Sequence, residues 1–147
     1  LEHRTLPSGP SLIDMVANTA LFVGLLRHYM HQDVEALEFA RVRSNFYEAA
    51  RYGLSARIDW LDGLRHPVCR LLKRTLLPAA ADGLGRLGID PDDRDRYLDV
   101  LERRLDSRQN GAVWQRRFLA RYPGDLVSLT AAMLEQQASD TPVHLWE

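Results

Sequence analysis

The sequence predicts a mainly α-helical chain with about six helices and one short strand end at its N-terminus. Apolar residues recur at intervals of three and four along most of the chain, and helix start and stop signals separate these stretches. Only residues 1–6 alternate as a strand does. We therefore expect a single region over residues 1–147, with a strand end at 1–6, a helical body at 11–138 and a tail at 139–147 that packs on the body.

The composition is that of a folded protein without a strong overall charge. Of the 147 residues, 46% are hydrophobic and 27% are charged, and the formal net charge is −1. These values predict no nucleic-acid partner and no attraction to an acidic membrane surface. The longest apolar run, near residues 17–26, is too short and too polar to cross a bilayer. We expect no contact with a membrane.

Candidate nucleophiles and metal ligands are few. Cys69 is the single cysteine, which excludes an intramolecular disulfide and fits a reducing, cytoplasmic compartment. Its apolar helical setting favours an inert thiol over a nucleophile. His28 and His31 are three residues apart, but no third ligand stands nearby at a helical spacing, so the end of a surface helix explains them better than a metal site.

The first helix is predicted from about residue 12 to about residue 30. Ser11 is a good N-cap, and Asp14 stands at the capping-box position. Apolar residues cover more than half of the helical wheel, so we expect the helix to pack on two sides. Asn18 lies between its two apolar stripes, where the amide needs a buried partner. Polar packing and a role in a site are both open for Asn18.

The second helix is predicted over residues 34–52 and ends at Gly53. Its apolar stripe is expected to face the core and consists of Phe39, Val42, Phe46, Ala49 and Ala50. One flank carries polar residues at intervals of four or three, namely Arg41, Asn45, Glu48 and Tyr52. The pattern alone favours a solvated flank over a binding role.

The later elements follow from turn and cap residues. Residues 54–65 predict a loop with a short extended section near 58–61, and Pro67 is well placed in the first turn of a helix that Pro78 kinks or restarts. Asp90-Pro91 is the clearest helix start, but the narrow apolar stripe behind it predicts a peripheral helix. Two further helices are expected from Asn110-Gly111 and over residues 126–137.

Glu2 and Arg4 stand two apart on the predicted strand end, so both side chains point to the same face. An acid beside an arginine on one face of a sheet is often a plain ion pair. The same arrangement can hold a divalent metal and the phosphate that the metal bridges. The residues alone leave both interpretations open.

Short segments spread along the chain form an ordered pattern. They are Leu1-Glu2-His3-Arg4, Pro7-Ser8-Gly9-Pro10-Ser11, Asp14-Met15-Val16-Ala17-Asn18, Asn45-Phe46-Tyr47, Ala50-Arg51-Tyr52-Gly53-Leu54, Asp95-Arg96-Tyr97-Leu98, Gly111-Ala112-Val113-Trp114-Gln115-Arg116 and Pro142-Val143-His144-Leu145-Trp146. In this order they resemble the C-terminal part of the glutamate–cysteine ligase type 2 family, and the last segment resembles the tail of one bacterial branch. These are ATP-dependent carboxylate–amine ligases related to glutamine synthetase. The resemblance spans nearly the whole chain.

The resemblance implies an α+β ligase fold, in which an antiparallel sheet curves into a cup with helices packed outside. This chain would supply the last strand end and most of the helices. The implied reaction uses ATP to phosphorylate the side-chain carboxylate of glutamate, and the amine of cysteine, or of another acceptor, then displaces phosphate. Magnesium ions neutralise phosphate charge in such a reaction, which with cysteine belongs to glutathione biosynthesis.

The resemblance also assigns roles to four residues. Glu2 matches a metal ligand, and Arg4 matches a catalytic arginine that contacts phosphate or the substrate carboxylate. Asn45 and Arg51 match polar positions of a helix that closes one side of the site, where they would bind substrate or nucleotide. Because Asn45 and Arg51 are six residues apart, they face different directions, and we expect at least one of them to be structural.

A different class of function competes with the ligase interpretation. The chain could be a free-standing helical module for binding or oligomerisation, with exposed arginines for an acidic partner and no catalysis. The ligase interpretation instead places the other metal-binding acids and the nucleotide-facing sheet upstream of Leu1, so we expect the chain alone to have no ligase activity. The amine acceptor and the oligomeric state, a homo-oligomer included, stay open.

Overall fold

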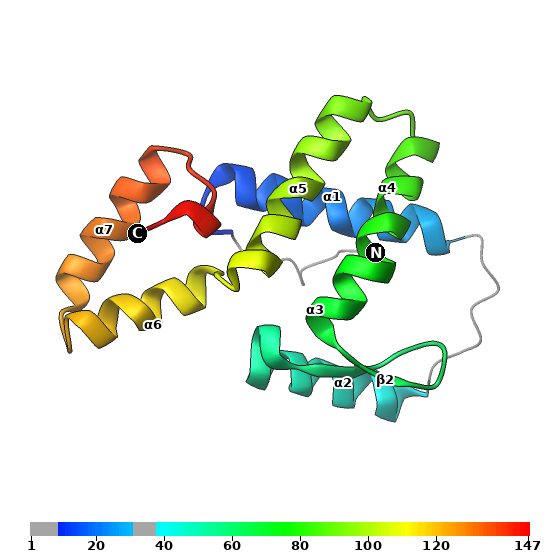
Figure 1. Ribbon diagram of the computed structural model, residues 1–147, viewed down its shortest axis with the longest axis horizontal. Coiled ribbons are helices and arrows are strands. Elements are labelled where there is room, and N and C mark those ends of the chain that lie inside the picture. The colour runs from blue at the N-terminus through cyan, green and yellow to red at the C-terminus, as the bar shows by residue number, and fades with distance from the viewer. Residues whose placement is uncertain (1–8, 31–37) are drawn as a thin grey trace.

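The computed structural model describes residues 9–30 and 38–147, and this part of the chain is mainly helical, as predicted. Glu2, Arg4, His31 and the strand end at 1–6 lie outside the described residues. The elements are α1 (Leu12–Tyr29), α2 (Phe39–Tyr52), β1 (Arg57–Asp59), β2 (Arg65–Pro67), α3 (Val68–Leu71), α4 (Leu77–Arg86), α5 (Pro91–Ser107), α6 (Gly111–Arg121) and α7 (Leu126–Ala138) (Figure 1). A π-helical segment, Leu72–Leu76, joins α3 to α4, and 3-10 turns lie at Gly53–Ser55 and Val143–Leu145.

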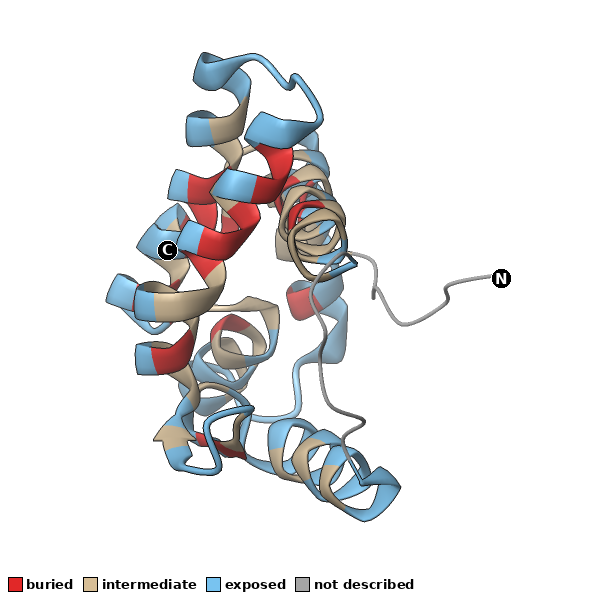
Figure 2. Ribbon diagram, turned by 90° about the vertical axis from the view of Figure 1, so that its right-hand side faces the viewer, coloured by how far each residue is buried: buried red, intermediate tan, exposed pale blue. Residues whose placement is uncertain are grey.

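The largest core lies where α1, α4 and α5 meet, and its buried residues are among those coloured red in Figure 2. Helix α5 was predicted to be peripheral, and this is wrong. Its apolar residues, Leu98, Val100, Leu101 and Leu105, are all buried. A narrow apolar stripe is sufficient here because α5 lies against both α1 and α4, while the charged remainder of the helix faces water.

Two glycines let α1 and α4 approach each other closely. A Cβ atom on Gly83 would lie 1.9 Å from the carbonyl oxygen of Gly24, and one on Gly24 would lie 2.4 Å from the carbonyl oxygen of Ala80. Real Cβ atoms do not come this close to backbone, so any larger side chain would push the helices apart. The crossing therefore requires glycine at both positions.

Helix starts were predicted correctly at three caps. The side chain of Ser11 accepts a hydrogen bond from the Asp14 amide, Asp90 accepts one from the Asp92 amide, and Asn110 accepts one from the Val113 amide. Pro78 follows the π-helical segment and lies in the first turn of α4. Proline has no N–H to offer and its ring crowds the preceding turn, so a widened turn just before it is a physically reasonable solution.

Asp14 does more than cap its own helix. Its side chain is fully buried, accepts hydrogen bonds from the Ser11 hydroxyl and the Val143 amide at 2.9 Å each, and pairs with Arg104 at 3.1 Å. Arg104 also donates to the side chain of Asn18 at 2.9 Å, which gives that amide the buried partner that the sequence required. These contacts join α1, α5 and the C-terminal tail.

The tail packs against α6 and α7 around two tryptophans. Val143 and Trp146 are buried together with Trp114 and Leu129. The buried side chain of Gln109 donates to the carbonyl oxygens of Val143 and Trp146 at 2.9 and 2.7 Å. The backbone of the tail is thus fixed by side chains, although the tail contains only a short 3-10 turn.

Candidate functional site

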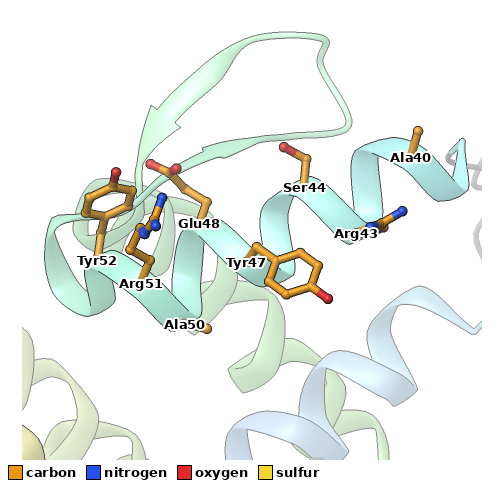
Figure 3. A pocket seen from close by; sticks show the side chains of 8 residues that line it. All are labelled: Ala40, Arg43, Ser44, Tyr47, Glu48, Ala50, Arg51 and Tyr52. Carbon is orange, nitrogen blue, oxygen red and sulfur yellow. The ribbon is translucent and has the colours of Figure 1, made fainter.

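The surface of α2 carries the positions that the sequence proposed for binding. A hollow of about 870 Å³ follows this helix and is lined by Ala40, Arg43, Ser44, Tyr47, Glu48, Ala50, Arg51 and Tyr52 (Figure 3). Helix α2 forms from these residues because alanines and arginines favour helix and Gly53, with a φ of 52°, ends it. The hollow therefore has one helix as its wall among the described residues.

The hollow is positively charged. Neither Arg43 nor Arg51 is paired with an acid in residues 9–30 and 38–147, and both are exposed. The Arg43 guanidinium lies 5.8 Å from the centre of the Tyr47 ring, a cation–π contact that orients it. Two free guanidinium groups beside hydroxyl groups suit an anionic ligand such as a phosphate or a carboxylate.

Glu48, the acid that lines the hollow, already has partners in the hairpin. Glu48 pairs with Arg65 at 3.3 Å and accepts a hydrogen bond from the Arg57 amide at 3.2 Å. Both partners belong to the hairpin formed by β1 and β2, which pair antiparallel. Glu48 thus attaches the hairpin to α2 and leaves the charge of the two arginines uncompensated.

Asn45 faces the hairpin. Its Nδ2 donates to the carbonyl oxygen of Asp59 at 2.8 Å, and its Oδ1 accepts from the Asp59 amide at 2.9 Å. The solvated flank favoured by the pattern is therefore wrong for Asn45 and Glu48, because this flank holds β1 in place. Arg51 lines the hollow instead, so the two residues do face different directions, as their spacing predicted. A substrate contact for either residue stays a prediction.

The apolar stripe of α2 was expected to be core, and this is wrong in the described part of the chain. Phe39 is 78% exposed and Phe46 is 65% exposed, and Val42, Ala49 and Ala50 are exposed as well. The reason is geometric: α2 contacts the hairpin and the following turn through its polar flank, so its apolar stripe points away from them. A second hollow, of about 420 Å³, lies on this stripe and is lined by Phe39, Val42, Arg43, Phe46 and Tyr47.

The described residues do not place a metal. They contain no group of three histidine, cysteine or acidic side chains that could hold an ion, and the predicted ligand Glu2 lies outside them. His28 is hydrogen-bonded to Asp82 at 2.6 Å. Cys69 is half-buried and donates to the carbonyl oxygen of Leu54 at 3.1 Å, which agrees with an inert thiol.

Sequence reasoning missed Arg43. This arginine lies eight residues before Arg51, which brings the two to the same side of a helix, and this spacing was the available signal. Reasoning from the sequence also missed the buried pair of Asp14 and Arg104, because nothing local indicates a partner 90 residues away.

Comparisons of the chain with protein-family models, with curated proteins and with solved structures find no match. Among the described residues, no helix has the length and apolar character needed to cross a membrane.

Proposed function

We propose that this chain is the helical C-terminal part of an ATP-dependent carboxylate–amine ligase that resembles glutamate–cysteine ligase. The order of the resembling segments along the sequence is one support. The observation that carries the proposal is the surface of α2, where aromatic residues are exposed next to two arginines that have no acidic partner among residues 9–30 and 38–147. Such a surface suits one wall of an anion-binding site, with a second wall contributed by another part of the protein.

The residues present suit the anionic half of this chemistry. Arg43 and Arg51 can neutralise a phosphate group or a substrate carboxylate, and the ring of Tyr47 keeps the first of them over the hollow. When bound, ATP supplies the phosphoryl group that activates the glutamate carboxylate for attack by an amine. The task of the arginines is to orient the anion and to stabilise the charge that develops on its oxygens.

The described residues suit magnesium binding less well than anion binding. Glu48 is the acid that lines the hollow, and it is held by Arg65 and the Arg57 amide. A magnesium ion would need oxygen ligands that the described residues do not gather here, so no step is assigned to it.

The test uses the longer gene product that contains this chain. We expect release of ADP and phosphate that requires both glutamate and an amine, with cysteine tried first and other amino acids after it. The 147-residue chain alone should release no phosphate above a boiled control. Glutamate-independent hydrolysis in the long protein, or a gene without an upstream β-rich segment, would contradict the proposal.

A free-standing binding or oligomerisation module is the second candidate. It is favoured by the hydrophobic cores of the described residues, one among α1, α4 and α5, another around Trp114 and Trp146, and a small one around Ile58 and Leu71. Thermal unfolding of the isolated chain separates the candidates. A sharp cooperative transition favours the module, whereas a broad transition with binding of a hydrophobic dye favours the ligase part.

A further inference from the structure

A further hollow, of about 830 Å³, lies apart from α2 and is lined by residues of α1, α6 and α7. Its apolar wall consists of half-buried side chains that border two different cores. Leu21 and Leu25 lie at the edge of the core of α1, α4 and α5, and Met133 lies at the edge of the core that contains Trp114. Hollows of roughly 300–1,000 Å³ with mainly apolar walls and a few oriented polar groups are the usual sites of small molecules.

The side-chain amide of Asn18 is oriented so that it can donate to a molecule in this hollow. Its Oδ1 accepts a hydrogen bond from Nη1 of Arg104 at 2.9 Å. A guanidinium group only donates, so the amide oxygen faces Arg104 and the amino group Nδ2 lies on the other side of the amide. Within residues 9–30 and 38–147, Nδ2 has no hydrogen-bond partner, yet it is not one of the buried unpaired atoms. Because Asn18 lines the hollow, this donor is open to a ligand.

Two more amides that line the hollow are oriented by the fold. Asn110 accepts a hydrogen bond from the Val113 amide through Oδ1 at 3.0 Å, which leaves its Nδ2 as a second donor. Nε2 of Gln115 lies 3.6 Å from the sulfur of Met133, so its Oε1 is left as an acceptor. These oriented polar groups are therefore all uncharged.

Among the described residues that line the hollow, Arg104 is the one with a full charge, and this charge is already balanced. Its Nη2 lies 3.1 Å from a carboxylate oxygen of Asp14, and the two side chains are 12% and 0% exposed. Arg104 thus differs from Arg43 and Arg51, whose charges are not balanced in the hollow of α2. An ionised ligand beside Arg104 would lose hydration without gaining a countercharge.

We propose that this hollow binds an uncharged, mainly apolar small molecule that carries a carbonyl oxygen. The carbonyl oxygen accepts a hydrogen bond from Nδ2 of Asn18, and the apolar body lies against Leu21, Leu25 and Met133. The oriented donor selects a ketone, an ester or an amide over a plain hydrocarbon. The balanced charge of Arg104 selects against a carboxylate of the same shape. None of these residues lines the hollow of α2, so the proposal is independent of the ligase function.

Fluorescence titration of the 147-residue chain with prodan tests the proposal. Prodan is an uncharged naphthalene ketone whose emission depends on its surroundings, and it should bind saturably. Three simpler naphthalenes are then compared as competitors. Methyl naphthyl ketone should bind about five- to tenfold more tightly than naphthalene, because it gains the hydrogen bond. Naphthoate, which is ionised at neutral pH, should bind at least about tenfold more weakly than the ketone.

The location of the site is tested by filling the hollow. Ala112→Trp places a large ring there from an exposed position on α6, and it should abolish the binding of prodan. Ala120→Trp is the matched control, because Ala120 is exposed on the same helix but is not a lining residue. Ala120→Trp should bind prodan as the wild-type chain does, and so should Phe46→Glu, which alters the apolar stripe of α2. Circular dichroism should show that every variant is folded.

Asn18→Asp tests the hydrogen bond itself. The carboxylate still accepts from Arg104, so the fold keeps this contact, but an acceptor replaces the donor Nδ2. The preference for the ketone over naphthalene should therefore disappear. Gln136→Glu adds the same charge on α7 at a position that does not line the hollow, and it should keep the preference.

Four results would overturn the proposal. They are the absence of saturable prodan binding to the wild-type chain, equal affinities for ketone and naphthalene, naphthoate binding as tight as that of the ketone, and prodan binding that survives Ala112→Trp. None of these results depends on ligase activity.

Discussion

The side-chain amide of Asn45 is hydrogen-bonded to both backbone groups of Asp59, at 2.8 Å to its carbonyl oxygen and at 2.9 Å from its amide. The amide thus continues the hydrogen bonding of β1 onto α2. Asn45→Ala should cost about 1–3 kcal/mol of unfolding free energy, because both backbone groups lose a partner. Ser44→Ala is the control, since Ser44 is exposed and is the residue next to Asn45 on the same helix. If Asn45→Ala and the wild-type chain were equally stable in denaturant titrations, the two hydrogen bonds between Asn45 and Asp59 would contribute nothing to stability.

The glycine contact between α1 and α4 gives a second pair of variants. Gly83→Ala should destabilise the fold by more than about 3 kcal/mol, because the new methyl group would collide with the Gly24 carbonyl oxygen. Gly85→Ala in the same helix meets its nearest atom at 3.9 Å, and alanine favours helix, so it should stabilise the fold by about 0.5–1 kcal/mol. Thermal and denaturant unfolding measure the stability of both variants. If Gly85→Ala were the less stable of the two, α1 and α4 would have to cross differently.

The buried ion pair between Asp14 and Arg104 should be costly to break. Arg104→Met leaves a carboxylate with 0% exposure without its countercharge, and we expect a loss of about 3–5 kcal/mol. The neighbouring Arg103 pairs with Asp99 on the surface, where its side chain is 63% exposed, so Arg103→Met should cost less than about 1 kcal/mol. Adding Asp14→Asn to Arg104→Met should cost less than the sum of the two single changes.

The unfolding free energy should fall as the pH drops, because His144 becomes protonated more readily in the unfolded chain than in the folded one. Burial lowers the pKa of His144 below its ordinary 6.5, and Arg103 and Arg104 act in the same direction while Asp14 opposes them. The folded chain therefore binds fewer protons than the unfolded chain between the lowered pKa and 6.5, so the unfolding free energy declines as pH drops through this interval. Above pH 6.5 the contribution is complete.

His144→Gln removes this titration and should flatten the dependence of unfolding free energy on pH just below pH 6.5. An NMR titration of the imidazole measures the same effect directly. A midpoint at or above 6.5 would contradict the effect of burial.

Substitution of Arg51 tests whether this arginine has a functional or a structural role. If the proposed ligase function holds, Arg51→Ala in the longer protein should reduce kcat/KM about 100-fold or more, because a cation that orients the reacting anion is lost. Its melting temperature should change little, since Arg51 is exposed. Arg121→Ala, an exposed arginine on α6, is the matched control and should be neutral in both measurements. An unchanged rate with a lower melting temperature would make Arg51 a structural residue.

Local signals account for the parts of the fold that sequence predicted well. Ser11, Asp90 and Asn110 begin helices because each side chain bonds an amide two or three residues further on, and Gly53 ends α2. These interactions are complete within one helical turn, so a short stretch of sequence contains all the information needed.

The errors concern the surroundings of a helix. The pattern identified the apolar stripes of α2 and α5 correctly, yet Phe46 is exposed, and α5, expected at the periphery, contributes Leu101 to the largest core. Periodicity defines which face of a helix is apolar, but neighbouring elements decide whether that face is covered. The candidate site was predicted only in part, for the same reason. Arg51 lines the hollow. Asn45 instead bonds Asp59, which lies 14 residues further along the chain and outside the helix of Asn45.

The Asp14 carboxylate has a consequence for the order of events during synthesis. Its partner Val143 is added 129 residues later. At about 5–20 residues per second, the ribosome takes on the order of ten seconds to cover this distance. Helix α1 is synthesised before Val143, so the Asp14 carboxylate is without this partner throughout the interval. The hydrogen bonding of the Asp14 carboxylate is thus completed only after residue 143 has been synthesised.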